Sequence, residues 1–230
     1  MRILILADIH ANWPALRAIQ EPHDVCFFLG DAVDYGPHPI PCVEWVRDHA
    51  SYAIRGNHDH AVAQRAAIEG RNGFRFLTRT TRELTWEHLQ APHLRYLAEL
   101  PVTARVTLGG SRFLLTHATP RDPLEEWVSN DPALWGELLR NVEADVVCVG
   151  HTHIPFVLQV GPKLVINPGS VGQPRDGDPR ASYAIWEDGK VEIRRVEYPL
   201  DDVIKDLEAT RLPPEVKRLS IAVLRTGGRC

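Results

Sequence analysis

The sequence predicts an α/β protein, with one domain that contains two β-sheets. Three short apolar runs at residues 3–7, 25–29 and 52–54 alternate with helical patterns, and this βαβαβ order favours parallel strands joined by right-handed crossovers. From residue 101 the pattern changes to paired segments around glycine turns, which is typical of β-hairpins. A chain of 230 residues is long enough for one domain with a substantial core.

The first half of the chain supplies the parallel strands and their crossovers. The run at residues 3–7 is apolar throughout, as in a strand that is covered on both faces. Asn12 can cap the helix that follows, and Pro14 lies in its first turn. A second helix is expected around residues 43–49. Residues 62–100 are also expected to be helical; they could form a cap beside a site, but we expect most of their leucines to serve packing alone.

The second half supplies hairpins, further helices and one more buried strand. The run at residues 145–149 is again apolar and predicts a strand inside the core. Other strands are expected at residues 102–108, 112–116, 156–160, 163–166, 183–186 and 191–196, and helices at 132–141, 201–209 and 214–223. The domain is expected to span residues 1–225, followed by a frayed tail at 226–230.

Composition and charge argue against several classes of protein. The net charge is -4, from 26 basic and 30 acidic residues, and no block of Lys or Arg predicts a nucleic-acid partner. No apolar run approaches about 18 residues, so we expect no membrane span, and the N-terminal run ends at Asp8, too early for a signal peptide. The four cysteines form no C-x-x-C pair, which favours a reducing compartment and hence a cytoplasmic location. A homo-oligomer is compatible with the sequence.

Five short motifs place metal-binding residue types directly after predicted strands. They are Asp8-Ile9-His10, Gly30-Asp31-Ala32-Val33-Asp34, Gly56-Asn57-His58-Asp59, Thr116-His117-Ala118 and Gly150-His151-Thr152-His153. Ligands of parallel sheets bind beyond the carboxyl ends of the strands, and Asp8, Asp31 and Asn57 lie at those ends. Each motif alone is a weak signal, but the five in this order indicate a metal site.

The residue types suit a pair of divalent ions. Side chains two residues apart share a face, so Asp8 and His10 can hold one ion together. Asp31 follows a strand and a glycine, so its carboxylate can approach and bridge two ions. Mixed nitrogen and oxygen ligation favours Mn, Fe or Zn over Ca. Two ions roughly 3.5–4 Å apart can hold a hydroxide at neutral pH and clamp the oxygens of a phosphoryl group in displacement. The sequence therefore predicts a hydrolase of phosphate esters.

With these motifs the chain resembles the calcineurin-like metallophosphoesterase superfamily, whose pattern is D-x-H, G-D-x-x-D, G-N-H-D/E, H and G-H-x-H. The match spans residues 8–153. The stretch Asn167-Pro168-Gly169-Ser170-Val171-Gly172 resembles the small bacterial and archaeal phosphodiesterase branch. The resemblance implies a four-layer α/β/β/α sandwich, in which two mixed β-sheets are flanked by helices.

The resemblance also implies a role for each motif residue. One ion would be held by Asp8, His10, Asp31 and His153, and the other by Asp31, Asn57, His117 and His151. His58 would be the general acid or stabilise charge on the phosphoryl group, and Asp34 would bond to His58 and hold its protonated form. A turn role for Asp34 alone stays open. Mn is the first choice for both ions, with Fe, Zn, Ni, Co and Mg as alternatives.

One position departs from the serine/threonine protein phosphatases of this superfamily. Those proteins carry an arginine after the second aspartate of the second motif, whereas this chain has Tyr35. Arg55 and Arg175 are the candidates for a substitute that binds the substrate. Arg55 could instead form an ion pair under the sheet, and Arg175 could belong to a surface loop or a subunit contact.

We expect a phosphodiesterase or phosphomonoesterase that acts on a small phosphoester or nucleotide. A serine/threonine-type or dinucleoside-polyphosphate phosphatase is the alternative enzyme. A non-catalytic, metal-binding scaffold of the same fold is the alternative outside catalysis, but His58 is not needed for metal binding alone and favours an enzyme. A metal-dependent nuclease would require a basic, aromatic-lined surface, which the charge balance does not favour.

Overall fold

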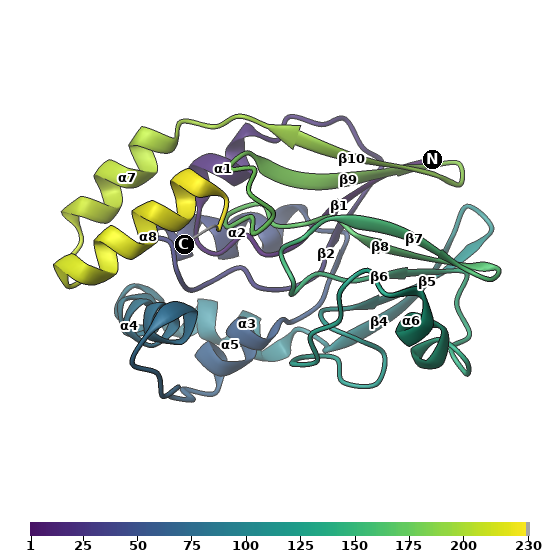
Figure 1. Ribbon diagram of the computed structural model, residues 1–230, viewed down its shortest axis with the longest axis horizontal. Helices are drawn as coiled ribbons and strands as arrows, with labels where there is room; N and C mark the ends of the chain where they lie inside the picture. The colour runs from purple at the N-terminus through teal and green to yellow at the C-terminus, as the bar shows by residue number, and fades with distance from the viewer. Residues whose placement is uncertain (229–230) are drawn as a thin grey trace.

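The computed structural model describes residues 1–228, which form two five-stranded β-sheets (Figure 1). The first sheet has the order β10-β9-β1-β2-β3 and consists of β1 (Arg2–Leu6), β2 (Val25–Phe28), β3 (Tyr52–Ala53), β9 (Ala181–Glu187) and β10 (Lys190–Val196). The second has the order β4-β5-β6-β8-β7 and consists of β4 (Thr103–Leu108), β5 (Ser111–Thr116), β6 (Val146–Cys148), β7 (Phe156–Val160) and β8 (Lys163–Asn167).

Helices surround these sheets. They are α1 (Trp13–Ala18), α2 (Pro39–His49), α3 (Asn57–Ala63), α4 (Gly73–His88), α5 (Ala91–Glu99), α6 (Pro132–Leu138), α7 (Leu200–Ala209) and α8 (Pro214–Thr226). The predicted cap of α1 is confirmed, because the side chain of Asn12 accepts a hydrogen bond from the backbone of Ala15 at 3.2 Å.

The two sheets pack face to face around a shared core. In β1, Ile3 and Ile5 belong to a cluster that also contains Phe113 of the second sheet, whereas Leu4 and Leu6 pack against helices. Successive side chains of a strand point to opposite faces, so both faces of β1 are buried. This is why the first strand is apolar throughout and shows no alternation.

Helices cover the outer face of each sheet. Leu16 of α1 and Val43 of α2 are buried against the first sheet. Trp135 of α6 is buried in one cluster with Val147 of the second sheet. Figure 1 shows α6 beside that sheet. The resulting order of helices, sheet, sheet and helix is the four-layer α/β/β/α sandwich that the sequence predicted.

The parallel strands direct the site to one edge of each sheet. β1, β2 and β3 run parallel, with Ile3 opposite Val25 in the first pair. β5, β6 and β8 also run parallel in the second sheet. The segments that leave the carboxyl ends of these strands carry all five motifs.

A third group of helices closes one end of the molecule. α4, α7 and α8 share a cluster of apolar side chains that includes Leu77, Leu84, Val203 and Val216, and they lie together on the left of Figure 1. Tyr35 belongs to the same cluster. This end of the fold is therefore packed directly against the loop that follows β2.

Two helical predictions differ from the structure in their extent. The helix expected at residues 43–49 begins at Pro39, because proline fits the first turn of a helix, where its missing N–H is not needed. Within residues 62–100, which were expected to be helical, residues 64–72 form no helix between α3 and α4. Gly70 and the polar residues around it favour turns there.

The end of the described chain is tied to the fold. Thr226, which the sequence placed in a frayed tail at 226–230, is the last residue of α8. Gly227 ends the helix in the left-handed region, and its carbonyl accepts a hydrogen bond from Gly177 at 2.9 Å. Residues 229 and 230 of that predicted tail lie outside the described residues. Among residues 1–228, no helix is long and apolar enough to cross a membrane.

Candidate metal centre

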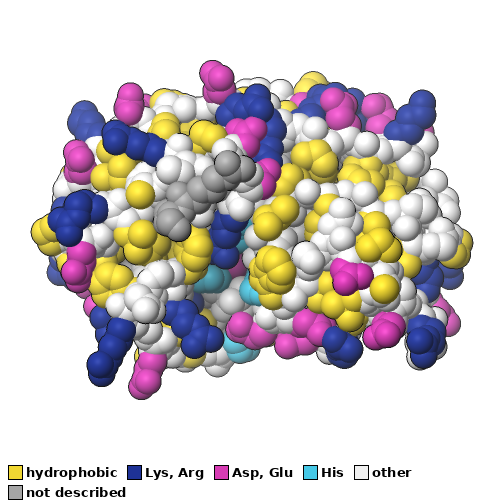
Figure 2. All heavy atoms as spheres, in the orientation of Figure 1, with side chains coloured by type: hydrophobic (Ala, Val, Ile, Leu, Met, Phe, Trp, Pro, Cys, Tyr) yellow, Lys and Arg dark blue, Asp and Glu magenta, His cyan; other side chains and the backbone are white. Residues whose placement is uncertain are grey.

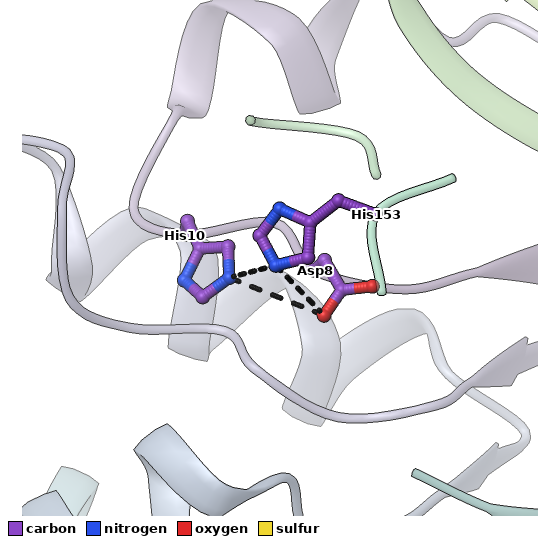
Figure 3. Close-up of side chains that lie close together, drawn as sticks. All are labelled: Asp8, His10 and His153. Atoms are coloured by element: carbon purple, nitrogen blue, oxygen red, sulfur yellow. Dashed lines mark hydrogen bonds and ion pairs between the residues drawn. The ribbon is translucent and has the colours of Figure 1, made fainter. Parts of the chain in front are cut away.

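Asp8, His10 and His153 form a first group of facing side chains (Figure 3). The first two follow β1, and His153 follows β6 of the other sheet. The Nε2 atoms of His10 and His153 lie 3.1 Å apart. Oδ1 of Asp8 lies 3.6 Å from Nε2 of His153 and 4.0 Å from Nε2 of His10. All three side chains are buried, and their donor atoms are close enough to share one ion.

Asp31 lies between this group and a second one. Its Oδ2 atom is 3.7 Å from Nε2 of His10 and 3.2 Å from Nε2 of His117. Nε2 of His117 lies in turn 3.1 Å from Oδ1 of Asn57. A carboxylate with ligand-type atoms on both sides has the position of a bridge between two ions.

His151 approaches the second group from the loop after β6. Its backbone N–H donates to the Asp8 carboxylate at 3.1 Å, and its ring centroid lies 5.1 Å from that of His117. Nε2 of His151 donates to the carbonyl of Glu125 at 3.2 Å. This leaves Nδ1 as the ring nitrogen with a lone pair for an ion.

The other histidines of the centre are held by the opposite ring nitrogen, because an oxygen accepts a hydrogen bond from Nδ1 in each of them. Nδ1 donates to Val33 O at 2.8 Å in His10, to Leu29 O at 2.8 Å in His117, and to Gln173 O at 2.6 Å in His153. Such bonds fix the tautomer and turn Nε2 inward. The sequence motifs contain the ligand-type residues, but only the fold supplies these carbonyls.

The backbone of the motifs is strained. The described non-glycine residues with a positive φ include Asp8, His10, Ala11, Asp31, Asp34, Tyr35, His151 and His153, and only Arg65 and Asp188 lie elsewhere. Each left-handed residue of this kind costs about 1–3 kcal/mol and persists where the surroundings over-determine it. Strained backbone of this kind clusters at functional sites, so its concentration in these loops indicates that they direct the Asp and His side chains toward one point.

Gly56 allows the loop after β3 to approach Asp31. A Cβ atom at position 56 would lie 2.1 Å from Oδ1 of Asp31, which is closer than any real contact. Oδ1 of Asp31 instead accepts a hydrogen bond from the backbone N–H of His58 at 2.9 Å. The glycine of the third motif is therefore required by the position of the Asp31 carboxylate.

The electrostatics of the centre call for added positive charge. Burial, together with the carboxylate of Asp31, raises the pKa of Asp8 to about 7. Burial acts to lower the pKa of His117, but the carboxylate of Asp31 outweighs it and raises this pKa to about 10. In the absence of cations, the buried carboxylates thus keep protons bound, either on a carboxyl group such as Asp8 or on a neighbouring imidazole such as His117. A donor set of carboxylate, amide and imidazole groups in this state fits divalent ions.

His58 stands beside the donor set and contacts Asp34. Its Nδ1 atom donates to Oδ2 of Asp34 at 2.7 Å, and its Nε2 atom lies 4.0 Å from Oδ2 of Asp31. Burial lowers the pKa of His58, but the carboxylates of Asp31 and Asp34 outweigh it and raise this pKa above the usual value. The predicted contact between His58 and Asp34 is present.

A cavity of about 310 Å³ opens over these residues and is lined by Asp31, Asn57, His58, His151 and His153. Figure 2 shows a hollow near the middle of this face, with histidine side chains visible in it and basic side chains beside it. Its other walls come from Tyr35, Glu125, Arg175 and the side of α4 that carries Phe74, Arg75, Thr78 and Arg82. The helical segment at residues 62–100 therefore borders the site and does more than fill space.

The two candidate arginines lie in different places. Arg175 lines the cavity, and its guanidinium stacks on Phe74, with Cζ 4.0 Å from the ring centroid. Arg55 is absent from the cavity lining, and its Nη1 atom donates to the carbonyl of Ala98 at 3.0 Å. The structure thus brings Arg175, and not Arg55, to the metal-binding residues.

Several supporting residues had no role in the sequence prediction. Asp59 is buried and accepts hydrogen bonds from the backbone of Asp31 at 2.7 Å and of Ala32 at 2.8 Å, which ties the second motif to the third. Ser170 donates to the carbonyl of Asp8 at 2.7 Å. Asn167 donates to the carbonyl of Gly150 at 2.7 Å. The stretch at residues 167–172 was noted only for its resemblance, and these bonds give it a structural role.

The buried Arg82 of α4 was also missed. Its Nη2 atom donates to Oδ2 of Asp34 at 2.7 Å. A signal was present in the sequence, because Arg82 follows Thr78 by four residues and shares the buried face of the helix. An arginine on such a face is almost never buried without a partner.

The fold and these donor groups define a class: α/β/β/α sandwiches that gather aspartate, asparagine and histidine at the carboxyl ends of strands from both sheets. The family description "Calcineurin-like phosphoesterase superfamily domain" matches residues 1–189. The chain therefore belongs to the calcineurin-like phosphoesterase superfamily.

Three similar proteins cover nearly the whole chain. An uncharacterized protein of Methanocaldococcus jannaschii is 33% identical over 237 residues, which include 92% of this chain and 93% of that protein. The crystal structure of a metallophosphoesterase from Sphaerobacter thermophilus is 36% identical, has a TM-score of 0.80, and covers 97% of this chain and 98% of its own. Phosphodiesterase YfcE of Escherichia coli is 27% identical over 211 residues, which include 84% of this chain and 91% of that protein.

Proposed function

We propose that this chain is a phosphoesterase that requires two divalent ions and hydrolyses small phosphodiesters, with phosphomonoesters as the alternative substrates. One observation carries the proposal: the His58–Asp34 pair lies beside the converged donor atoms, and His58 lines the same cavity. Metal binding alone does not need a histidine in that position. A metal-binding scaffold would therefore leave this pair without a purpose.

The donor atoms divide into two sets around Asp31. Asp8, His10, Asp31 and His153 would hold one ion, and Asp31, Asn57, His117 and His151 the other. When bound, the ions supply Lewis acidity that activates water and neutralises charge on the phosphoryl oxygens. We propose manganese as the native metal, because the set mixes imidazole nitrogen with carboxylate and amide oxygen and contains no thiolate.

His58 serves as the proton donor. Hydrolysis forms a bond between phosphorus and the oxygen of water, and that water releases one proton to the solvent. The bond between phosphorus and the ester oxygen breaks with its electron pair, and this oxygen takes a proton from Nε2 of His58. Asp34 accepts the Nδ1–H and keeps Nε2 turned to the cavity. A positioned acid of this kind contributes typically about 10²–10⁴-fold in rate.

Arg175 serves as the substrate-binding cation in place of the arginine that Tyr35 replaces. It lines the cavity, forms no ion pair among the described residues, and keeps a buried Nε atom without a partner. A guanidinium held on the faces of Phe74 and Tyr35 can donate to phosphoryl oxygens. The Escherichia coli relative is named a phosphodiesterase, which supports diesters as the first substrates to test.

The test is turnover with Mn²⁺ on bis-p-nitrophenyl phosphate and p-nitrophenyl phosphate, with the metal content measured on the same sample. We expect two ions per chain and hydrolysis of the diester. Preference for the monoester would replace the diesterase by a phosphatase. Two bound ions without turnover of either ester, or of a panel of small nucleotides, would contradict the proposal in favour of a scaffold.

A further inference from the structure

Arg82 makes an unusual contact with the carboxylate of Asp34. Its side chain is only 4% exposed, and both Nε and Nη2 donate to Oδ2 of Asp34, at 2.9 and 2.7 Å. Nη1 donates to the carbonyl of Ala66 at 3.2 Å. An arginine from the middle of α4 is thereby fixed at the back of the site.

All donors to Asp34 converge on one oxygen. Oδ2 of Asp34 also accepts the Nδ1–H of His58 at 2.7 Å, whereas Oδ1 is buried and has no hydrogen-bond partner. Arginine–carboxylate pairs frequently form two parallel bonds, one to each carboxylate oxygen. Here both bonds of Arg82 go to the oxygen that His58 uses. The contact therefore fixes the rotation of the carboxylate about its Cβ–Cγ bond.

This rotation decides how the histidine ring is held. The ring of His58 lies next to that of Tyr35, with 5.0 Å between centroids, so the neighbouring ring limits how far the imidazole of His58 can rotate. On the Nδ1 side, the ring donates to Oδ2 of Asp34 at 2.7 Å, and Nη2 of Arg82 lies 3.4 Å from the same nitrogen. If the carboxylate turned, the ring would lose the acceptor that keeps Nε2 facing the cavity.

We propose that Arg82 is a positioning residue for proton donation by His58: it locks Oδ2 of Asp34 in place and so aims Nε2 of His58 at the leaving oxygen. This rests on the proposed function of His58. Helix α4 would then contribute to the site in two ways. It lines the cavity with Phe74 and Thr78, and it carries the arginine that positions His58.

The experiment compares two esters that differ in their need for a proton. A p-nitrophenolate anion can leave without taking up a proton. The alkoxide of an ethyl ester needs a proton in order to leave. Arg82→Met keeps the length of the side chain and removes every donor. We expect it to slow kcat on the ethyl ester by about 10²-fold, within the range of a general acid, and to change kcat on the p-nitrophenyl ester far less. Arg79→Met, on the exposed face of α4, is the matched control and should change neither rate.

Two further variants keep the test decisive. Arg82→Lys retains the charge but cannot deliver two N–H groups to one oxygen, and it serves if Arg82→Met fails to fold. The double variant Arg82→Met/His58→Ala should be no slower than His58→Ala on the ethyl ester, because the arginine acts through the histidine. The metal content should stay at the wild-type value in every variant.

The outcomes separate this proposal from the one on which it rests. Equal loss on both esters with normal metal content, or a double variant much slower than His58→Ala, would show that Arg82 does not act through the acid. Unchanged rates for Arg82→Met would also reject its role. If His58→Ala itself shows no difference between the esters, the failure lies in the proton-donor assignment of His58.

Discussion

His10 and His153 face each other across 3.1 Å between their Nε2 atoms, although 143 residues separate them in the chain. His10 comes from the first sheet and His153 from the second. The nearby carbonyl groups already accept hydrogen bonds from the Nδ1 atoms of the two rings. They therefore offer no partner to the two Nε2 atoms that face each other. The contact is best satisfied by a cation between the two rings.

Metal binding should therefore stabilise the fold. An ion present at 100 times its Kd adds about 2.7 kcal/mol to the free energy of unfolding, which raises Tm by about 5–10 °C for a chain of this size. The measurement is thermal unfolding of chelated protein with and without added Mn²⁺. A Tm that does not move with Mn²⁺ would contradict the fit of the donor set. Mg²⁺ should raise Tm less, because it prefers oxygen ligands.

Replacement of the proton donor should separate binding from turnover. His58→Ala is expected to keep both ions and to lose about 10²–10⁴-fold in kcat, since we propose His58 as the proton donor and not as a metal ligand. His58 lies close enough to His10 and Asp31 for the three to hold an ion, so metal analysis of the variant tests this assignment. Metal analysis and steady-state kinetics on the same preparation measure both quantities. His60→Ala, two residues further along α3 and outside the cavity lining, is the control. Unchanged turnover of His58→Ala would reject the role.

Neutralising the bridge should cost the second ion as well as activity. Asp31→Asn keeps the size of the side chain, but a neutral amide bridges two cations poorly, and Oδ2 of Asp31 is the atom near both His10 and His117. We expect less than two ions per chain and little turnover. Asp188→Asn, at a side chain that is 79% exposed, controls for the loss of one charge. Full occupancy by two ions would count against the bridge.

The close approach at Gly56 gives a prediction that involves no donor atom. Gly56→Ala would place its Cβ 2.1 Å from Oδ1 of Asp31, so the carboxylate or the loop must move. We expect a lower metal content and a lower Tm. Gly136→Ala, where the added methyl meets nothing within 4 Å in α6, should stabilise the protein by about 0.5–1 kcal/mol. Similar behaviour of the two variants would refute the steric argument.

The two candidate arginines should differ in their effect on KM. Hydrogen bonds to charged groups contribute about 1.5–3 kcal/mol, so Arg175→Met should raise KM by about 10- to 100-fold. Arg55→Met should leave KM unchanged, because its guanidinium bonds to Ala98 outside the cavity. Kinetics on the better of the two chromogenic esters decide the question. The reverse result would reinstate Arg55 as the substrate-binding residue.

The sequence predicted the fold well where its patterns are local. The apolar run at residues 3–7 could be recognised as a doubly covered strand, and Asn12 as a helix cap, because neither depends on distant parts of the chain. The helical stretch at residues 62–100 was harder. Its break at residues 64–72 has a local signal in Gly70, but its place at the cavity depends on packing against α8 and near Tyr35, which no local pattern contains.

The residues of the candidate site were likewise predictable where their signal is local in the sequence. Asp8 and His10 could be found because their chemistry is contained in one motif at a strand end. The helical spacing could indicate that Arg82 is buried, but not its partner, since Asp34 lies 48 residues away and only the fold brings them together. Arg55 adjoins the third motif in sequence, but the backbone directs its side chain toward Ala98. Proximity of Arg55 to the third motif in the sequence therefore did not predict a place in the cavity, because its side chain points away from the site.

The distance in sequence between His10 and His153 has a consequence for how the protein matures. A nascent chain that has emerged from the ribosome only as far as β5 already contains Asp8, His10, Asp31 and Asn57, but neither imidazole of the loop after β6. These early residues would meet cellular metal as weak, open ligands. The complete donor set exists only after the second sheet has closed on the first, so on the proposed function the folded protein, and not the nascent chain, would select the metal.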